Sequence, residues 1–158
     1  MNENRGYADP YLSCCFLPDK SQLVTGNRNG DIYQWKDGKI LNTVKGNGNP
    51  IWQLISYKDS DETKLLAGQN GKIAVWEFRT QKLQPQIEIN LAANADFLRP
   101  DIRSLDYSPQ SKKILAGTRG SEIIEIDETH QKQVSLVKGH YSASKNAELW
   151  GVACHPKD

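Results

Sequence analysis

The chain has 158 residues, with 20 basic and 19 acidic side chains and a formal net charge of +1 at pH 7. This length indicates about one domain, with a core large enough to form without a disulfide or a metal. The balanced charge argues against binding to nucleic acid or to a membrane surface, and no apolar run approaches the roughly 20 residues that a membrane-spanning helix needs. The three cysteines, two of them adjacent, indicate reduced thiols in a cytosolic protein.

The dominant feature along the chain is an internal repeat. Three segments share two apolar residues, a small residue and a glycine, a polar turn, and then an alternating strand pattern. They read LVTGNRNGDIYQW (23–35), LLAGQNGKIAVW (65–76) and ILAGTRGSEIIEI (114–126). Their glycines, Gly26, Gly68 and Gly117, are separated by 42 and 49 residues, close to the period of four-stranded propeller blades.

Each repeat unit is expected to form four strands, because period-2 alternation lies between turn signals. Asn29-Gly30 and Asn70-Gly71 predict tight hairpins, since glycine adopts positive φ without strain. The only expected helix is a short one at 92–97. The expected strands are 12–16, 22–26, 31–35 and 40–44 in the first unit, 51–56, 64–68, 72–77 and 86–90 in the second, 102–106, 113–117, 122–126 and 133–137 in the third, and a final strand at 149–154.

The end of the chain repeats the start of a unit. Trp150 matches Trp52, and His155-Pro156 matches Ser108-Pro109. Propellers close with four to eight blades, so we expect an incomplete all-β propeller whose remainder lies in the same or a longer chain. The predicted divisions are an N-terminal polar segment (1–11), three blades (12–50, 51–101 and 102–148) and the first strand of the next blade (149–158).

The third unit resembles a known family. LAGTRGSEIIEIDE, VKGH and ELWGVACHP are similar to a signature of the echinoderm microtubule-associated protein-like family, a divergent group of WD40 propellers. The resemblance is strong over 102–156, whereas the first two units match only the general WD40 pattern. The Trp-Asp dipeptide is absent, and Gly-His occurs once, at Gly139-His140. The resemblance implies WD40-type β-propeller blades in a cytoskeletal protein.

No residue pattern indicates a metal, a cofactor or catalysis. Adjacent Cys14 and Cys15 lack the spacing of zinc ligands and face opposite sides of a strand. We interpret them as small buried core residues rather than ligands, and His155, next to Cys154, as a turn residue. Hydrolase, zinc-protease and phosphate-loop motifs are missing. We therefore expect no enzymatic activity; a hydrolase that uses the propeller channel is the least favoured alternative.

Four tryptophans recur at equivalent positions and are expected to pack between blades, although an aromatic stripe that binds a partner is the alternative. The WD40 resemblance further implies that His140 begins a buried hydrogen-bond network whose other members lie in the next blade. The predicted structural residues are Trp35, Trp52, Trp76, His140 and Trp150.

The candidates for partner binding lie in the loops that a propeller displays on one face. Arginine is enriched at interfaces for its planar head with several donors, and cations facing the acidic surface of tubulin would make salt-sensitive contacts. Plain solvated loop charge is the alternative for each residue. The candidates are Arg28, Asn49, Arg99, Asp101, Arg119 and Lys145.

The resulting hypothesis is a non-enzymatic, microtubule-associated WD40 propeller segment. It would act as a scaffold for tubulin, axonemal or other cytoskeletal proteins, in the cytoplasm and cytoskeleton and also in the cilium axoneme. The alternative is a soluble WD40 adaptor for signalling or ubiquitin-pathway complexes, with no cytoskeletal role. Neither hypothesis includes nucleic acid or a membrane as a partner.

Overall fold

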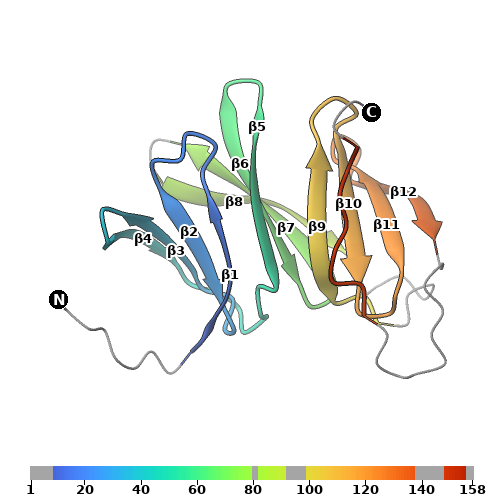
Figure 1. Cartoon of the computed structure of the whole chain (residues 1–158), viewed down its shortest axis with the longest axis horizontal. Coiled ribbons are helices and arrows are strands. Elements are labelled where there is room, and N and C mark those ends of the chain that lie inside the picture. Colours follow the sequence, from blue (N-terminus) through green and yellow to red (C-terminus); the bar gives the residue numbers. More distant parts are fainter. Residues whose placement is uncertain (1–8, 80–81, 92–98, 138–147, 156–158) are drawn as a thin grey trace.

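A computed structural model describes residues 9–79, 82–91, 99–137 and 148–155. Within these residues the chain forms three four-stranded sheets, and every strand pair is antiparallel (Figure 1). In each sheet the strands lie in chain order, so each sheet is a simple meander. The predicted all-β fold class with four-stranded units is therefore confirmed. Over the same residues, no helix is long and apolar enough to cross a membrane.

The strands have the following bounds. The first sheet contains β1 (Tyr11–Phe16), β2 (Leu23–Asn27), β3 (Ile32–Lys36) and β4 (Lys39–Val44). The second contains β5 (Gln53–Asp59), β6 (Glu62–Gln69), β7 (Lys72–Arg79) and β8 (Lys82–Asn90). The third contains β9 (Ile102–Ser108), β10 (Lys113–Thr118), β11 (Ile123–Asp127) and β12 (Lys132–Val137).

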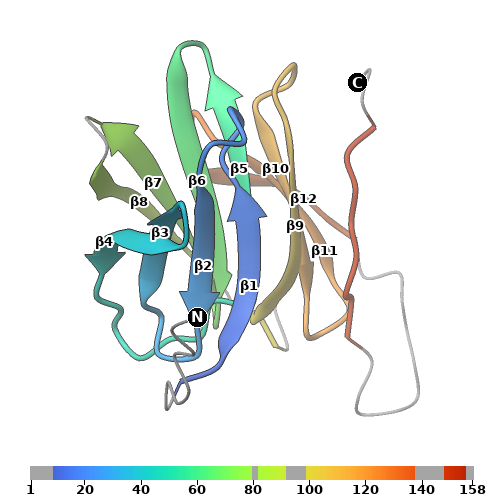
Figure 2. The ribbon, with the colours of Figure 1, turned by 60° about the vertical axis from the view of Figure 1, so that its left-hand side comes forward.

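Three expectations for individual elements have different outcomes. β8 begins four residues earlier than expected, because its backbone already pairs with β7 at Lys82 opposite Arg79. The strand expected at 149–154 is wrong as a ladder. Residues 148–155 run beside β9 and β10 and make single hydrogen bonds to them, but they form no ladder with a strand of the described chain (Figures 1 and 2). The helix expected at 92–97 lies outside the described residues.

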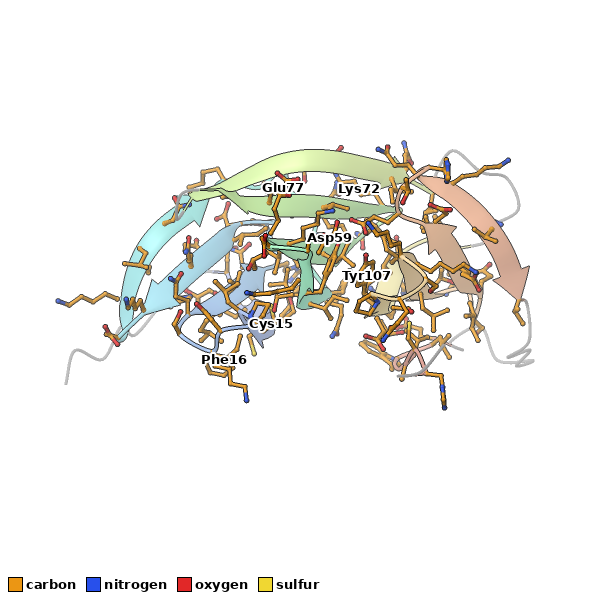
Figure 3. The ribbon with its side chains drawn as sticks, turned by 90° about the horizontal axis from the view of Figure 1, so that it is seen from above. Cys15, Phe16, Asp59, Lys72, Glu77 and Tyr107 are labelled. Carbon is orange, nitrogen blue, oxygen red and sulfur yellow. The ribbon has the colours of Figure 1, made fainter. Side chains whose placement is uncertain are left out.

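The three sheets follow one another around a fan. β1 packs against β5, and β5 packs against β9, so the first strands of the sheets are neighbours on the inner side. Seen from above, the last strands β4, β8 and β12 form the outer edge (Figure 3). This is the arrangement of propeller blades, in which each sheet presents one face to the preceding sheet and the other to the next.

Two hydrophobic cores fill the spaces between the sheets. The first core joins the first and second sheets and includes Val24, Ile32 and Leu65. The second core joins the second and third sheets and includes Leu66 and Ile114. Leu65 and Leu66 are adjacent in β6 yet belong to different cores, because successive strand residues face opposite sides. Each buried aliphatic side chain contributes about 1.5–3 kcal/mol.

The repeat glycines set the distance between sheets. A Cβ atom on Gly26 would lie 2.7 Å from Ile51, and a Cβ atom on Gly68 would lie 2.5 Å from Ile102. A Cβ atom on Gly117 would lie 2.8 Å from Leu149 in the same way. The glycine in the second strand of each sheet therefore admits the aliphatic residue that opens the next unit, and Leu149 takes the place that Ile51 and Ile102 take earlier.

The expectation that both adjacent cysteines are buried is wrong for Cys14. Its equivalents in the next two sheets, Leu54 and Leu105, are buried against the preceding sheet, but no described sheet precedes β1, and Cys14 is exposed. Cys15 faces the first core, and burial raises the pKa of its thiol to about 12. That thiol is therefore protonated and unreactive at neutral pH.

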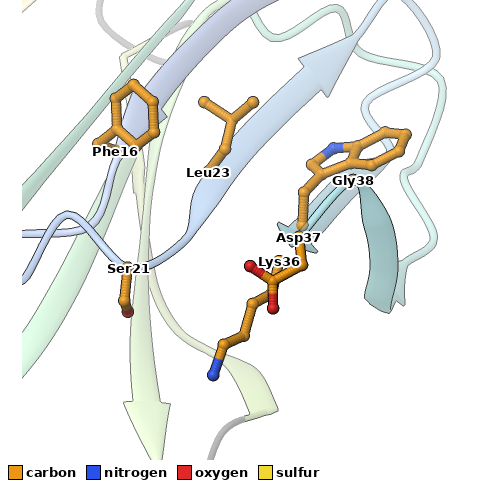
Figure 4. A pocket seen from close by; sticks show the side chains of 7 residues that line it. Phe16, Ser21, Leu23, Lys36, Asp37 and Gly38 are labelled. Carbon is orange, nitrogen blue, oxygen red and sulfur yellow. The ribbon is translucent and has the colours of Figure 1, made fainter.

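The same open face of the first sheet carries aromatic side chains. The ring of Tyr11 lies 5.7 Å from that of Tyr33 and 6.1 Å from that of Trp35, with near-perpendicular planes. Beside them, Phe16, Leu23 and Trp35 line a shallow pocket of about 250 Å³ (Figure 4). In the second sheet the equivalent tryptophan, Trp76, packs against the first core, so the first sheet exposes a surface that the second sheet covers.

A buried polar cluster joins the second and third sheets at the rim of the β5–β6 hairpin. The hydroxyls of Tyr57 and Tyr107 each donate to the carboxylate of Glu128 at 2.7 Å. Lys64 pairs with Glu128 at 2.9 Å and with Asp59 at 2.6 Å. Burial and the Glu128 carboxylate raise the pKa of both tyrosines, so their hydroxyls remain donors. Glu128 thus satisfies three donors from three strands.

The glycine contact predicts a strong effect of one methyl group. Gly68→Ala should lower the free energy of unfolding by about 1–3 kcal/mol, because the added Cβ overlaps Ile102 and forces the sheets apart. Gly151→Ala is the matched control, because its Cβ would meet no atom within 4 Å. Urea unfolding of both variants measures the difference, and equal stabilities would contradict the proposed spacing role.

The polar cluster predicts a comparable cost for one carboxylate. Glu128→Ala should destabilise the fold by about 3 kcal/mol, because it leaves two tyrosine hydroxyls and the Lys64 ammonium without their buried acceptor. Asp61→Ala removes an exposed carboxylate in the β5–β6 turn and should change stability by less than about 0.5 kcal/mol. Thermal unfolding of the two variants distinguishes the cases, and a small loss for Glu128→Ala would show that water replaces its contacts.

Candidate interaction surface on the loop face

One rim of the fan gathers the loops that the sequence marks for partner binding. In each sheet the first strand begins at this rim and the hairpin between the second and third strands turns there, because the strands form antiparallel meanders. We call this rim the loop face; it is the lower rim in Figure 1. Its described members are residues 27–31, 45–52, 69–72, 99–103, 118–122 and 148–151.

Polar side chains at the ends of β2 and β10 fix two of these hairpins. Asn27 Oδ1 accepts hydrogen bonds from the backbone N–H groups of Asn29 at 3.0 Å and Asp31 at 2.7 Å. Thr118 Oγ1 accepts in the same way from Gly120 and Glu122, each at 3.1 Å. Such local bonds replace the ladder where the chain reverses. These bonds therefore fix the backbone that carries the side chains of each hairpin.

The two predicted Asn-Gly hairpins have the expected backbone. Gly30 has a φ of 83° and Gly71 a φ of 69°. Both values lie in the left-handed region, where glycine is favoured because it has no Cβ. The tight-turn expectation is confirmed at both positions.

The acidic side chains of the loop face turn inward. Asp31 is 7% exposed and its carboxylate accepts from the Gly46 N–H at 2.8 Å, from the Tyr33 hydroxyl at 3.1 Å and from Lys45 at 3.3 Å. Although burial disfavours its charged form, these donors hold the pKa of Asp31 below its usual value. Glu122 is 1% exposed and accepts from the Thr118 hydroxyl. These carboxylates hold the loops together and are withdrawn from solvent.

Four of the six described cationic side chains of the loop face lie differently, whereas Lys72 and Arg103 are covered and paired with Glu88 and Glu148. Arg28, Lys45 and Arg99 are exposed, and the side chain of Arg119 is 42% exposed. The other two acids of the face are more covered: the exposed fraction is 24% for the Asp101 side chain and 16% for Glu148. The surface that a partner would meet is therefore more positive than the formal charges of the loops suggest.

A residue that sequence reasoning missed lies at the centre of the third sheet's loops. Arg103, near the start of β9, is 5% exposed. Its guanidinium carbon lies 4.0 Å from the ring centroid of Trp52 and 5.5 Å from that of Trp150. Its Nε donates to Glu148 at 2.9 Å. Stacking on indole faces is favourable for a guanidinium, so Arg103 connects units two and three to the segment that follows.

The alignment of the repeat units was the sequence signal that could have identified Arg103. It follows Ile102 as Trp52 follows Ile51 and as Trp150 follows Leu149, so the three side chains occupy equivalent places at the start of successive units. A cation between two tryptophans in such a row indicates a stack.

The structure brings some of the predicted partner-binding residues together. Arg119 Nη1 lies 3.7 Å from Asp101 Oδ2, and the Arg119 and Gly120 N–H groups donate to the carbonyls of Asp101 and Arg99. Arg28 and Asn49 lie nearer the first two sheets, where the Asn49 carbonyl accepts from Gln69. Lys145 and His140 lie outside the described residues.

The four tryptophans occupy different environments. Trp76 packs against the first core, and Trp52 stacks on Arg103 while its Nε1 donates to Asn70 at 2.8 Å. Trp35 lies on the open face of the first sheet, and its Nε1 donates to Thr25 at 2.9 Å. Trp150 is 66% exposed. Trp52 and Trp150 hold equivalent positions but differ in burial, whereas Trp35 and Trp76 are both half-buried.

Among the described residues, no group of three or more His, Cys, Asp and Glu side chains is placed to hold a metal ion. The Cys154 and His155 pair lies apart from the loop face, where the Cys154 N–H donates to Asp106 at 2.7 Å. Burial raises the pKa of the Cys154 thiol.

A family model for the WD domain, G-beta repeat, matches residues 4–36. The chain is 26% identical over 149 residues to echinoderm microtubule-associated protein-like 2 of Mus musculus, and that alignment covers 92% of this chain and 21% of the relative. The proteins of the same name from Rattus norvegicus and Homo sapiens match with the same identity and coverage. The chain therefore spans about a fifth of the length of these relatives.

Solved structures show the same fold. The structure of U3-55K and the crystal structure of the RRP9 WD40 repeats each superpose with a TM-score of 0.69 at 16% identity, over 86% of this chain and 41% of the other. Proteins built of WD40 repeats generally act as non-enzymatic scaffolds for protein–protein interaction. WD40-type β-propeller blades are thus the fold class of this chain, and its resemblance to the echinoderm microtubule-associated protein-like family is confirmed over 92% of its length.

Proposed function

We propose that this chain is a segment of a microtubule-associated WD40 scaffold that presents its loop face to an acidic protein surface. The observation that carries the proposal is the division of charge on that face. Its described acids are covered and engaged with donors of the same chain, whereas Arg28 and Arg99 are exposed and Lys45, although it pairs with Asp31, keeps 80% of its side chain exposed. Cations displayed on loops attract an acidic partner and set its orientation.

The relatives support the cytoskeletal identity of that partner, because their name is microtubule-associated. The proposal therefore places the chain in the cytoplasm, on the cytoskeleton, together with the rest of the propeller. The cilium axoneme stays a prediction from the family resemblance alone. So do the division of the chain into blades at 12–50, 51–101 and 102–148 and the partner roles of Asn49 and Lys145.

The proposed role is binding without catalysis. A general base needs a carboxylate or imidazole that is free to accept a proton from a substrate. On the loop face, each described carboxylate already accepts hydrogen bonds or pairs with an arginine. These groups are engaged in holding the loops, which suits a binding surface.

The charge division predicts a specific loss of binding. The double variant Arg28→Glu with Arg99→Glu should weaken co-sedimentation with microtubules at least about tenfold, because it reverses two exposed charges, and the remaining binding should depend less on salt. Lys58→Glu is the matched control: Lys58 is exposed on the opposite rim, next to the β5–β6 hairpin.

The same spin without tubulin shows how much of each protein pellets by self-association. Unchanged binding of the double variant, with unchanged salt dependence, would rule out the loop-face cations as the contact surface. Absence of microtubule binding by the unmodified chain would favour the soluble adaptor.

A further inference from the structure

On the loop face, one carboxylate lies between two guanidinium groups, at the junction of the third sheet and residues 148–151. The floor of this site is Arg103, which is nine-tenths buried and held between Trp52 and Trp150. Its side is Arg119, and the chain's own Glu148 lies between the two guanidinium groups. Solvent reaches Trp150, which is 66% exposed, and the side chain of Arg119, which is 42% exposed.

Glu148 shows what chemistry the site accepts. Its Oε2 lies 2.9 Å from Arg103 Nε, and its Oε1 lies 3.0 Å from Arg119 Nε. One carboxylate therefore bridges two guanidinium groups. Arginine is the side chain best suited to carboxylates, because its planar fork of N–H donors matches the two carboxylate oxygens. A guanidinium is also weakly hydrated, so it loses little hydration when it stacks on an aromatic ring.

The arginines are not saturated by Glu148. Arg103 Nη1 is buried and reaches no acceptor among the described residues, and Arg119 Nε lies near Glu148 without forming an aligned hydrogen bond. A buried guanidinium N–H without an acceptor is unfavourable. The two arginines could therefore form additional hydrogen bonds to an acceptor that is better placed than Glu148.

Glu148 can leave the two arginines without a change in the backbone of its segment. Residues 148–155 pair with no described strand, and the Leu149 N–H bond to Thr118 and the Ser104 bond to the Leu149 carbonyl are their backbone attachments near the site. Rotation of the Glu148 side chain needs neither of these bonds to break. Exchange of Glu148 for another carboxylate is thus a side-chain event at the surface.

We propose that Arg103, Arg119 and Trp150 form a receptor for a glutamate or aspartate side chain of an acidic peptide, and that Glu148 occupies this receptor until the peptide binds. The incoming carboxylate takes the place of Glu148 between the guanidinium groups, and the exposed indole of Trp150 packs against the peptide beside it. The inference rests on the proposed function only in taking the partner to be acidic. It names the site that binds one acidic side chain of that partner.

The test is a titration of the full chain with a hexaglutamate peptide, followed by tryptophan fluorescence. Glu148→Gln keeps the size of the side chain but removes the competing charge, so it should bind the peptide about tenfold more tightly. Arg103→Lys keeps the charge but loses the fork and the stack, so it should bind about tenfold more weakly. Trp150→Phe identifies the fluorescence change that comes from the site.

Lys58→Arg is the control, because it exchanges the same two cationic side chain types at an exposed position on the opposite rim and should leave peptide affinity unchanged. Thermal unfolding of each variant confirms that it is folded. The receptor is overturned if Glu148→Gln binds no more tightly than the unmodified chain, or if Arg103→Lys and Lys58→Arg behave alike. Inorganic phosphate that competes as well as the peptide would also overturn the assignment to a carboxylate.

Microtubule co-sedimentation of the same variants separates this inference from the proposed function. If Arg103→Lys sediments normally while the Arg28 and Arg99 reversal does not, the scaffold stands and the receptor is wrong. If the peptide results hold but no variant or unmodified chain sediments, the receptor stands and its acidic partner is another protein.

Discussion

The fold depends on one repeated contact, in which the glycine of each second strand receives the aliphatic residue that opens the next unit. Gly26 receives Ile51, Gly68 receives Ile102, and Gly117 receives Leu149. No side chain larger than hydrogen fits at these positions without moving the neighbouring sheet. The contact sets the distance between sheets, and through it the two hydrophobic cores and the order of first strands along the inner side. A single small residue per unit thus specifies the geometry that unites separate sheets.

The loop face follows from that spacing. Because each aliphatic residue is anchored at a glycine, the residue after it lies at the start of a first strand, on the loop-face rim. Trp52, Arg103 and Trp150 hold this position in successive units. Their spacing suits a guanidinium between indoles, and the stack on Trp52 brings Arg103 to 4.0 Å from the ring centroid. The core contact therefore also positions the next residue of the chain, which lies on the loop face.

Much of the fold could be predicted from sequence because the signals were local. The glycine spacing, the period-2 alternation and the Asn-Gly turns indicated four-stranded units, and Gly30 and Gly71 have the positive φ that the turns require. What failed depended on neighbours. Cys14 has the same pattern as Leu54, yet it is exposed because no described sheet covers its face. The 149–154 segment has strand character, but a strand needs a partner to form a ladder.

The candidate site was harder to predict than the fold for a physical reason. The arginines at 28, 99 and 119 lie in loops, where composition alone suggests exposure, and the structure brings Arg119 beside Asp101. Arg103 lies within a strand, where a charged residue is expected to face solvent. Its burial is stabilised by two aromatic rings and by Glu148, whose positions are 51, 47 and 45 residues away. Only the alignment of units places these partners together, and side-chain pairing between units is not encoded in any local pattern.

Residues 148–151 take part both in the packing between units and in the binding surface. In an extended chain, neighbouring side chains face opposite sides, so Leu149 packs at Gly117 while Glu148 and Trp150 meet the arginines at the rim. The anchored side chain holds the segment in place while its neighbours exchange contacts. A partner that displaces Glu148 therefore meets a surface whose backbone is already positioned, and little ordering of the chain opposes binding. The repeated glycine contact that spaces the sheets thus also supports the binding surface beside it.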